Sequence, residues 1–317
     1  MKLVTFEIKS GDRHIGAMTA DGGGVVDFTA SDKAPAFRDM LALIDGGEPA
    51  LDRARKLAMG GEGAVVVPAG GQRLLAPVPE PRQMRDFLCF EQHLRQARAN
   101  RYLFGTGTER LDPATIDVPK VWYEQPVYYK CNRFSVIGTD QDVLWPRYSK
   151  MLDYELEFGI FLGKGGKNIR RDKAREHIFG YCIFNDVSAR DAQFREMQGQ
   201  LGPAKGKDFD TGNVMGPWLV TPDELPDPYN LTMVARVNGE EWTRGNSGAM
   251  QHKFEDILAH ASNEETLMPG EFFGSGTVGN GCGLELGRFL NPNDVMELEV
   301  EGLGMLRNRI VAQDGSA

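Results

Sequence analysis

Three acids alternate with apolar residues in one short segment of the chain. Asp153, Glu155 and Glu157 are separated by Tyr154 and Leu156. In a β-strand this period of two places the three carboxylates on one face and the apolar side chains on the other. Neighbouring carboxylates repel one another. The segment therefore predicts either a solvated outer face of an antiparallel strand or a site whose ligand offsets the repulsion.

A fourth acid follows a short apolar run further along the chain. Asp186 comes directly after the run Tyr181–Asn185. A carboxylate at the mouth of a buried strand, beside two more on a neighbouring strand, supplies the hard oxygen ligands that Mg2+, Mn2+ or Ca2+ prefer. None of the five histidines has a spacing typical of a zinc site. The pattern favours a divalent-metal site made of carboxylates and water.

Further motifs follow in order around these acids. Asp86 lies seven residues before His93, at the start of a predicted helix. The other motifs are Asn185–Gln193, Leu201–Thr211, Thr266–Glu271, Gly276–Gly279 and Gly283–Leu286. Each motif alone has low specificity. As an ordered set, they resemble the fumarylacetoacetate hydrolase family over roughly residues 80 to 310.

The resemblance implies a fold and a metal site. The expected fold is α+β and β-rich, with a mixed β-sandwich roll as catalytic domain and a small N-terminal α+β domain, usually in a homodimer. The metal, Mg2+ or else Mn2+ or Ca2+, is expected to be held by Glu155, Glu157 and Asp186. Asp86 matches the additional acid of the larger family members.

The resemblance also implies catalytic and substrate-binding roles. His93 matches the histidine that activates water, Glu285 matches the glutamate that orients it, and Lys207 matches the lysine of a Gly-Lys-x-Phe motif. Smaller members often carry a glutamate three positions after the histidine, where this chain has Gln96, so the orienting role falls to Glu285. The substrate pocket positions are matched by Tyr129, Arg190, Gln193, Thr211 and Thr277, and Arg101 lies near a substrate-binding arginine.

The activity that this resemblance implies is divalent-metal-dependent hydrolysis of a C–C bond in a small 2-oxo or 1,3-dicarbonyl acid. The metal stabilises the developing enolate. Lys207 and Arg101 offset the substrate carboxylate, and His93 acts as general base on water. A decarboxylase of oxaloacetate type, or an isomerase of an unsaturated dioic acid, keeps the metal site and needs His93 and Glu285 for protons only.

Each of these residues also has an ordinary structural interpretation. His93 can be a histidine on a surface helix, Lys207 one of many solvated lysines, and Glu285 a solvent-facing residue in an alternating run. The acids can likewise form the incidental acidic face of a non-enzymatic, β-rich binding protein. Titration with magnesium separates the two readings, since a scattered acidic face gives weak, nonsaturating heat and a preformed site saturates.

The elements that must position these residues can be predicted from periodicity. Short alternating segments with one helical stretch predict a small α+β domain over residues 1–75. A Pro-rich linker over residues 76–82 follows, because three prolines in five positions favour extended backbone. The catalytic domain is expected over residues 83–317, with strands at Leu152–Leu162, Tyr181–Phe184, Asn213–Asn238 and Val295–Glu301, and helices at Glu91–Tyr102, Lys173–His177 and Phe254–Ser262.

Charge and composition exclude several classes of partner. Hydrophobic residues make up 41% of the chain and charged residues 26%, as in ordinary globular proteins, and the formal net charge is -9. This charge repels phosphate backbones and anionic lipids. We therefore expect no nucleic-acid or membrane partner, and instead a small acidic substrate that meets local positive charge.

The N-terminal segment, the lengths of the apolar stretches and the cysteines bear on the cellular compartment of the protein. The N-terminal residues alternate as in a strand and lack the apolar core of a signal peptide, and no stretch is long and apolar enough to cross a membrane. The widely spaced Cys89, Cys131, Cys182 and Cys282 form no C-x-x-C pair and are expected to be small core residues. A reducing, cytoplasmic location follows as the expectation.

Overall fold

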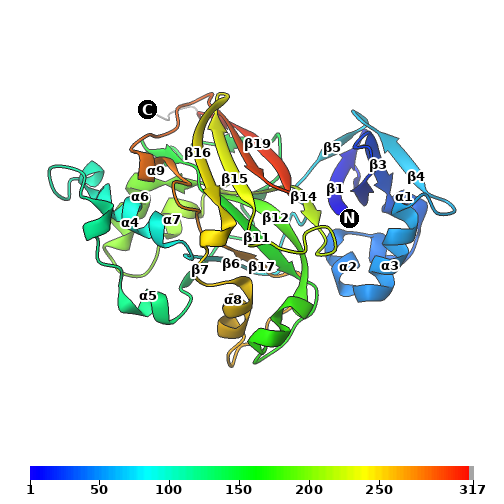
Figure 1. Cartoon of the computed structure of the whole chain (residues 1–317). Helices are drawn as coiled ribbons and strands as arrows, with labels where there is room; N and C mark the ends of the chain where they lie inside the picture. The colour runs from blue at the N-terminus through cyan, green and yellow to red at the C-terminus, as the bar shows by residue number, and fades with distance from the viewer. Residues whose placement is uncertain (314–317) are drawn as a thin grey trace.

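The computed structural model describes residues 1–313 and shows a strand-rich body with a smaller lobe at one side (Figure 1). The smaller lobe contains the N-terminus and packs short helices beside a set of strands. Its strands are β1 (Lys2–Ile8), β2 (Arg13–Met18), β3 (Gly24–Asp27), β4 (Val65–Pro68) and β5 (Gln72–Leu74). Its helices are α1 (Phe28–Ser31), α2 (Met40–Asp45) and α3 (Gly47–Ala58), with a 3-10 turn at Pro35–Phe37.

One mixed sheet of twelve strands runs through both parts of the molecule. The strands of the body that it contains are β6 (Met84–Phe87), β7 (Tyr128–Lys130), β8 (Val136–Ile137), β11 (Leu156–Leu162), β12 (Ile178–Asp186), β14 (Asn213–Val220) and β17 (Phe272–Gly274). The order is β4-β3-β2-β1-β14-β12-β11-β17-β6-β7, with β5 paired to β1 and β8 paired to β14.

A second, five-stranded sheet covers one face of the first. Its order is β16-β15-β18-β19-β9, with β9 (Asp142–Leu144), β15 (Thr232–Val237), β16 (Glu240–Asn246), β18 (Val295–Val300) and β19 (Gly304–Val311). β18 and β19 lie against β12 and β14. The large apolar core between the sheets includes residues of both. A short ladder, β10 (Leu152–Asp153) with β13 (Ser188–Ala189), completes the body.

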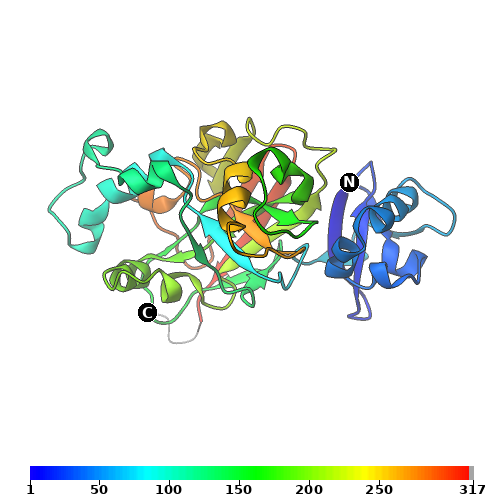
Figure 2. The ribbon, with the colours of Figure 1, turned by 90° about the horizontal axis from the view of Figure 1, so that it is seen from below.

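The helices near the candidate site gather at the end of the body far from the N-terminal lobe (Figure 2). These are α4 (Glu91–Ala99), α5 (Lys120–Glu124), α6 (Arg190–Met197) and α7 (Ala204–Lys207). The body also contains α8 (Phe254–Ala261) and α9 (Gly283–Leu286), and 3-10 turns at Arg101–Phe104, Pro113–Thr115, Arg171–His177 and Ser247–Ala249.

The strand-rich α+β class predicted from the sequence is confirmed, and the acid-rich segment differs from its prediction in one respect. The expected strand over 152–162 is interrupted, because only β10 and β11 are regular and Glu155 forms an isolated bridge to Cys282. Every residue of the segment is buried. The interpretation of its acids as a solvated outer face is therefore wrong.

The two parts of the molecule pack against each other more extensively than two domains joined by a linker would. Residues 76–82 contain no helix or strand, as their prolines predict, but Ala76 and Val78 are buried. Leu3 of β1 pairs with Leu219 of β14, so the sheet continues across the junction, and both parts contribute to a second apolar core. The division into domains at 1–75 and 83–317 thus stays a prediction.

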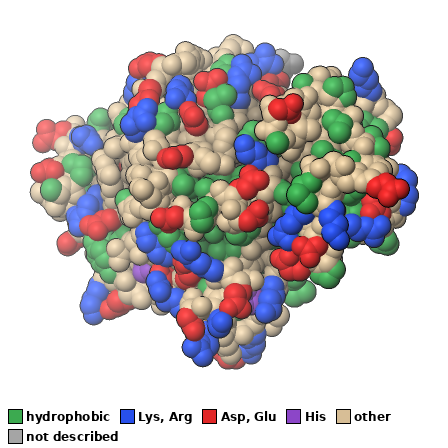
Figure 3. All heavy atoms as spheres, turned by 45° about the vertical axis from the view of Figure 1, so that its right-hand side comes forward, with side chains coloured by type: hydrophobic (Ala, Val, Ile, Leu, Met, Phe, Trp, Pro, Cys, Tyr) green, Lys and Arg blue, Asp and Glu red, His purple; other side chains and the backbone are tan. Residues whose placement is uncertain are grey.

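The surface carries both signs of charge. Lys and Arg side chains are interspersed with Asp and Glu side chains over the face drawn in Figure 3. Many of them form exposed pairs, such as Arg55 with Asp52 and Arg288 with Glu240. Within residues 1–313 no helix combines the length and the apolar character that a membrane span needs.

Candidate active site

Three of the four predicted metal ligands converge at one place on the large sheet. Carboxylate oxygens of Asp86, Glu157 and Asp186 lie within 4.8 Å of one another, and all three residues are buried. The strand order β12-β11-β17-β6 produces this convergence, because it places residues distant in the sequence on neighbouring strands.

A glycine in the strand between them leaves the space that the carboxylates occupy. Gly274 on β17 pairs with Asp86 on β6. A Cβ at Gly274 would lie 2.4 Å from Oδ1 of Asp86 and 3.3 Å from Oε2 of Glu157, well inside contact distance. A side chain at this position would therefore force the acids apart.

The carboxylates of the cluster suit a divalent cation, because two of their oxygens lack a hydrogen-bond partner within residues 1–313. Oδ1 of Asp86 and Oδ1 of Asp186 are buried and have no hydrogen-bond partner among the described residues. Buried acceptors are nearly always paired in native proteins. Converging carboxylate oxygens are the donors that Mg2+, Mn2+ and Ca2+ prefer, so these residues suit the ion that the sequence predicted.

Burial and mutual repulsion change the acidity of this cluster. Burial, followed by the charge of Asp186, raises the pKa of Asp86 to about 8. Burial and the neighbouring Asp86 raise the pKa of Glu157 well above its usual range, and burial raises the pKa of Asp186 to about 6. Without a cation, the folded cluster holds protons near neutral pH.

These shifts predict an unusual pH dependence of the apoprotein. The folded state keeps a proton on Asp86 at pH values between its ordinary pKa of 3.8 and about 8, where the unfolded chain has lost it. The free energy of unfolding in the presence of a chelator therefore falls as pH rises through this window. Saturating Mg2+ should weaken or reverse the trend and release protons on binding.

Thermal unfolding across this pH range, with chelator and with Mg2+, tests this expectation. Calorimetry in buffers of different ionisation enthalpy counts the protons that Mg2+ displaces. An apoprotein that gained stability steadily up to pH 8 would contradict the shared-proton cluster.

Glu155 and Lys207 form a buried ion pair beside the cluster. Lys207 Nζ lies 2.6 Å from Oε2 of Glu155, 2.6 Å from Oδ2 of Asp186 and 2.6 Å from Oγ of Ser188. Burial alone would raise the pKa of Glu155, but Lys207 and Arg190 outweigh it and hold the pKa well below its usual range. The three N–H donors of Lys207 are used here, so it neutralises Glu155 and Asp186 and has no donor left for the predicted substrate carboxylate.

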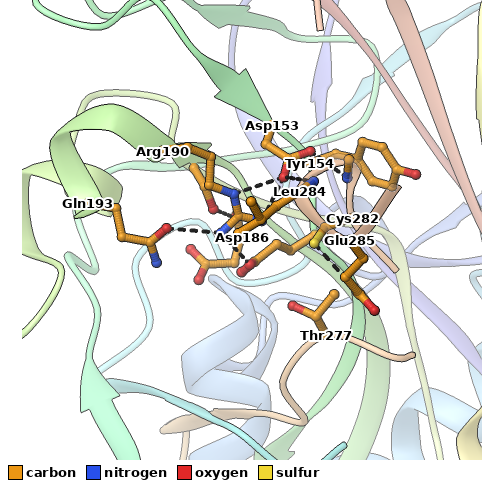
Figure 4. A network of polar contacts seen from close by, with 12 residues as sticks. Asp153, Tyr154, Asp186, Arg190, Gln193, Thr277, Cys282, Leu284 and Glu285 are labelled. Carbon is orange, nitrogen blue, oxygen red and sulfur yellow. Dashed lines mark hydrogen bonds and ion pairs between the residues drawn. The ribbon is translucent and has the colours of Figure 1, made fainter. Parts of the chain in front are cut away.

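Arg190 is held by a second set of acceptors (Figure 4). Its Nε donates to Asp153 Oδ2 at 2.8 Å, its Nη1 lies 2.8 Å from Glu155 Oε1, and Nη1 donates to Gln193 Oε1 at 3.0 Å. Asp153 also accepts from the backbone N–H of Leu284 at 2.9 Å. Asp153, the first acid of the alternating segment, thus ties Arg190 to the start of α9.

His93 and Glu285 form the expected pair although they lie far apart in the sequence. Nδ1 of His93 on α4 lies 2.8 Å from Oε1 of Glu285 on α9. The backbone N–H of Asn280 donates to Oε2 of Glu285 at 2.7 Å, which fixes the carboxylate. Asn100, at the end of α4, donates to the carbonyl of Leu284 at 2.7 Å and holds the two helices together.

The solvated interpretations of His93, Lys207 and Glu285 are wrong, because all three side chains are buried. Nε2 of His93 has no hydrogen-bond partner among the described residues, and His93 lines a cavity. This arrangement leaves one imidazole nitrogen for chemistry and uses the other for orientation.

One cavity of about 580 Å³ unites these groups. Its lining includes the polar side chains of Asp86, Asp186, Glu155 and His93, and apolar side chains such as the stacked rings of Phe104 and Phe194. All but one of the predicted pocket residues line it: Arg101, Tyr129, Arg190, Gln193 and Thr277.

Two of these residues contact the acid cluster directly. Tyr129 donates its hydroxyl hydrogen bond to Asp186, and Thr277 donates to Oε1 of Glu157 at 3.2 Å. The structure does not bring Thr211 to the cavity. Thr211 Oγ1 instead accepts from the backbone N–H of Leu144 at 2.8 Å, so its contact is structural.

Sequence reasoning missed three residues of the site. Arg98 lines the cavity beside Arg101, Ser188 accepts from Lys207, and Cys282 lies 3.5 Å from Oε1 of Glu285. The sequence could have suggested Arg98, because it lies on the same helix as His93. No local pattern singles out Ser188 or Cys282, because the contacts that bring them to the site are with Lys207 and His93, which come from other segments.

Comparison with known proteins gives relatives over nearly the whole chain. The human mitochondrial protein named oxaloacetate tautomerase is 32% identical over 299 residues, which is 94% of this chain and 87% of the relative. A fumarylacetoacetate hydrolase from Exiguobacterium antarcticum has a solved structure with a TM-score of 0.74 and 27% identity, covering 99% of this chain and 100% of that one.

A third likeness shows the fold. The structure of maleylpyruvate hydrolase from a Sphingobium species, in complex with manganese(II) and pyruvate, has a TM-score of 0.73 at 22% identity and covers 98% of this chain and 99% of that one. The family model described as "Fumarylacetoacetate (FAA) hydrolase C-terminal" matches residues 83–311. The family match covers most of the chain, and the human relative is 32% identical over 94% of it. The chain therefore belongs to the fumarylacetoacetate hydrolase family of enzymes.

Proposed function

We propose that this chain is a divalent-metal-dependent hydrolase that cleaves a C–C bond in a small 2-oxo or 1,3-dicarbonyl acid. One observation carries the proposal. The buried His93–Glu285 pair, 2.8 Å apart, lines the same cavity as Asp86 and Asp186, so a base with a free nitrogen faces a metal site across a space that fits a small acid. A base oriented in this way can activate water.

Asp86, Glu157 and Asp186 hold the metal in this proposal, with Glu155 beside them. A bound Mg2+ or Mn2+ supplies Lewis-acid stabilisation for negative charge on the two oxygens of a 2-oxo or 1,3-dicarbonyl group. The manganese in the maleylpyruvate hydrolase complex is consistent with such an ion. Lys207 neutralises Glu155 and Asp186, so the site keeps acids close together without excess negative charge.

His93 and Glu285 handle the protons. His93 Nε2 takes a proton from water, which attacks the distal carbonyl of the substrate, and Glu285 stabilises the resulting imidazolium through Nδ1. The C–C bond then breaks to release a carboxylic acid and a carbanion equivalent, which His93 reprotonates. The buried positions of both residues exclude bulk water from the pair.

A second candidate is proton transfer without hydrolysis. The human relative is named for oxaloacetate tautomerase activity, and the same His93–Glu285 pair can move a proton between carbon and oxygen of a 2-oxo acid. Decarboxylation of oxaloacetate, or isomerisation of an unsaturated dioic acid, uses the same groups. These reactions need no attacking water.

Turnover of a small substrate panel tests the proposal. Acylpyruvates, fumarylpyruvate and oxaloacetate are assayed with Mg2+ and with Mn2+. Hydrolysis of an acylpyruvate or of fumarylpyruvate to two acids is the expected result. Turnover restricted to enol–keto exchange or decarboxylation of oxaloacetate, with no C–C hydrolysis, would replace the hydrolase proposal by the second candidate.

Two arginines in the cavity wall predict a preference for diacids. Arg98 and Arg101 line the cavity, and burial, followed by the nearby charge of Arg101, lowers the pKa of Arg98. A second substrate carboxylate relieves this repulsion through charge-assisted hydrogen bonds. Arg101→Ala should raise KM for a diacid about tenfold and change KM for a matched monoacid much less.

Arg95→Ala is the matched control, on helix α4 just before the 3-10 turn that contains Arg101. Arg95 pairs with Glu91 at 2.7 Å and does not line the cavity that contains the acids. Steady-state kinetics on a diacid and a monoacid of equal length give the comparison. Equal KM changes for both substrates in Arg101→Ala would rule out a carboxylate subsite at this wall.

We also propose a homodimer in a reducing compartment, taken to be the cytoplasm. Family membership supports the dimer, and the four free, buried cysteines support the reducing compartment. Sedimentation at micromolar protein concentration is expected to give about twice the mass of one chain. A monomer under these conditions would remove the dimer from the proposal.

A further inference from the structure

Three side chains next to the carboxylate cluster form a second, chemically different set of metal donors. His93, Cys282 and Glu285 are all buried, and one donor atom of each lies within 4.8 Å of the others. We propose that this triad is an inhibitory site for a borderline-soft divalent cation, Zn2+ in the first place. It is separate from the hard-ion site at Asp86.

The distances of the triad are close to those of a tetrahedral zinc site. Oε1 of Glu285 lies 2.8 Å from Nδ1 of His93 and 3.5 Å from Sγ of Cys282, and Sγ lies 3.9 Å from Nδ1. Bonds of about 2.0–2.3 Å at tetrahedral angles place such donors about 3.3–3.6 Å apart. Shifts of about half an ångström therefore suffice to bring the three atoms to coordinating distance.

The donor types select the ion. A thiolate, an imidazole nitrogen and one carboxylate oxygen form a mixed S/N/O set, which suits Zn2+ or Co2+ and is disfavoured by Mg2+ and Ca2+. The all-carboxylate cluster has the opposite preference. Since His93 is the member of the triad that lines the cavity, an ion reaches the triad from that space past the imidazole ring.

Binding balances as an exchange of protons for a metal ion. The Cys282 thiol, which points toward Glu285 in Figure 4, releases its proton to solvent, and the proton that His93 Nδ1 shares with Glu285 Oε1 moves to Nε2, so that Nδ1 can coordinate. Nothing is oxidised or reduced. The occupied triad no longer permits the His93–Glu285 hydrogen bond, so the imidazole loses the group that orients it.

Cobalt(II) is the probe, because a Co2+–thiolate bond has a strong near-ultraviolet charge-transfer absorption that oxygen and nitrogen ligands lack. The whole protein, with Mg2+ in large excess, is titrated with Co2+ under reducing conditions. We expect a saturable thiolate band with one equivalent of Co2+, which Zn2+ then removes. Cys282→Ala should abolish the band and weaken Zn2+ binding by about tenfold or more.

Cys182→Ala is the matched control. Cys182 is equally buried, but only burial shifts its pKa, and it belongs to the apolar core of β12. This variant should keep the full band. A band that is missing in the wild type, or that persists in Cys282→Ala, overturns the site. Circular dichroism of each variant shows that it is folded, and a Cys282→Ser variant replaces Cys282→Ala where folding fails.

Inhibition provides the second readout and rests on the proposed function. Zn2+ should inhibit turnover at saturating Mg2+ with the affinity measured by displacement of Co2+, and Cys282→Ala should raise the inhibition constant in proportion. If the thiolate band forms without inhibition, the metal site stands and the role of His93 as base fails. If inhibition occurs without the band, the triad is not the site of inhibition.

Discussion

Glu157→Gln is expected to abolish metal-dependent turnover and to leave the apoprotein at least as stable as the wild type. Glu157 is one of the three converging carboxylates, so the amide removes an anionic ligand from the metal site. Its pKa is raised well above the usual range by burial and by Asp86. The folded apoprotein already disfavours its charge, and a neutral residue of the same shape removes that penalty.

Glu155→Gln should behave differently, although the two acids stand two residues apart. Glu155 accepts from Lys207 at 2.6 Å and lies 2.8 Å from Nη1 of Arg190, in a buried environment. Loss of its charge leaves two buried cations undercompensated. Removal of one partner from a buried ion pair typically costs about 3–5 kcal/mol of unfolding free energy. We expect inactivity together with a marked fall in stability.

Thermal unfolding in chelator, Mg2+ titration calorimetry and turnover assays separate the two variants. Glu299→Gln is the control, because Glu299 is a half-exposed strand acid paired with Arg236 and lies outside the site. It should leave all three measurements nearly unchanged. Near-normal turnover of Glu157→Gln at saturating metal would show that Glu157 is not a ligand.

His93→Ala is expected to lower hydrolytic turnover by about 10²- to 10⁴-fold, the usual cost of losing a positioned general base. The structure supports a large effect, since His93 is buried, oriented by Glu285 through Nδ1 and free at Nε2. Its side chain is not among the converging carboxylates. Mg2+ affinity should therefore change little, which calorimetry can verify.

The double variant distinguishes a functional pair from two independent residues. Glu285→Gln should lose much of the activity on its own, and adding it to His93→Ala should cost little more, because the two groups act as one unit. Full additivity would argue for separate roles. Substrate choice adds a further test, since acylpyruvate hydrolysis at the wild-type rate in His93→Ala would refute the hydrolytic mechanism.

The same variant also addresses the alternative reaction. Decarboxylation of oxaloacetate needs no activated water, so it should survive His93→Ala far better than hydrolysis does. If the wild type proves to be a tautomerase, the variant should lose proton exchange instead.

The residue types of the site could be predicted from the sequence because they occur in ordered motifs. These motifs contain the acids at Asp86, Glu155, Glu157 and Asp186, and also His93 and Glu285. Strand periodicity located β11 and β12, since an apolar run bounded by polar residues predicts a buried strand. Helices α4 and α8 followed from composition in the same way.

The tertiary structure decided what each acid does. Asp153, Glu155 and Glu157 have the same local pattern, yet Asp153 binds Arg190 and backbone amides, Glu155 pairs with Lys207, and Glu157 joins the converging carboxylates. Periodicity specifies the face on which a side chain lies, but its partner comes from another strand or helix. The break in the strand at Glu155 depends likewise on its bridge to Cys282.

Lys207 and Thr211 likewise have partners that the sequence pattern did not predict. Lys207 was predicted to meet the substrate, but three acceptors from two distant segments use its donors. Thr211 was predicted to line the pocket, but it caps the backbone near Leu144. The sequence by itself determined the family, the strand-rich class and the chemical groups of the site. Only the packed sheets decided the pairings, because pKa values, hydrogen bonds and charge compensation depend on distances between segments that the sequence does not encode locally.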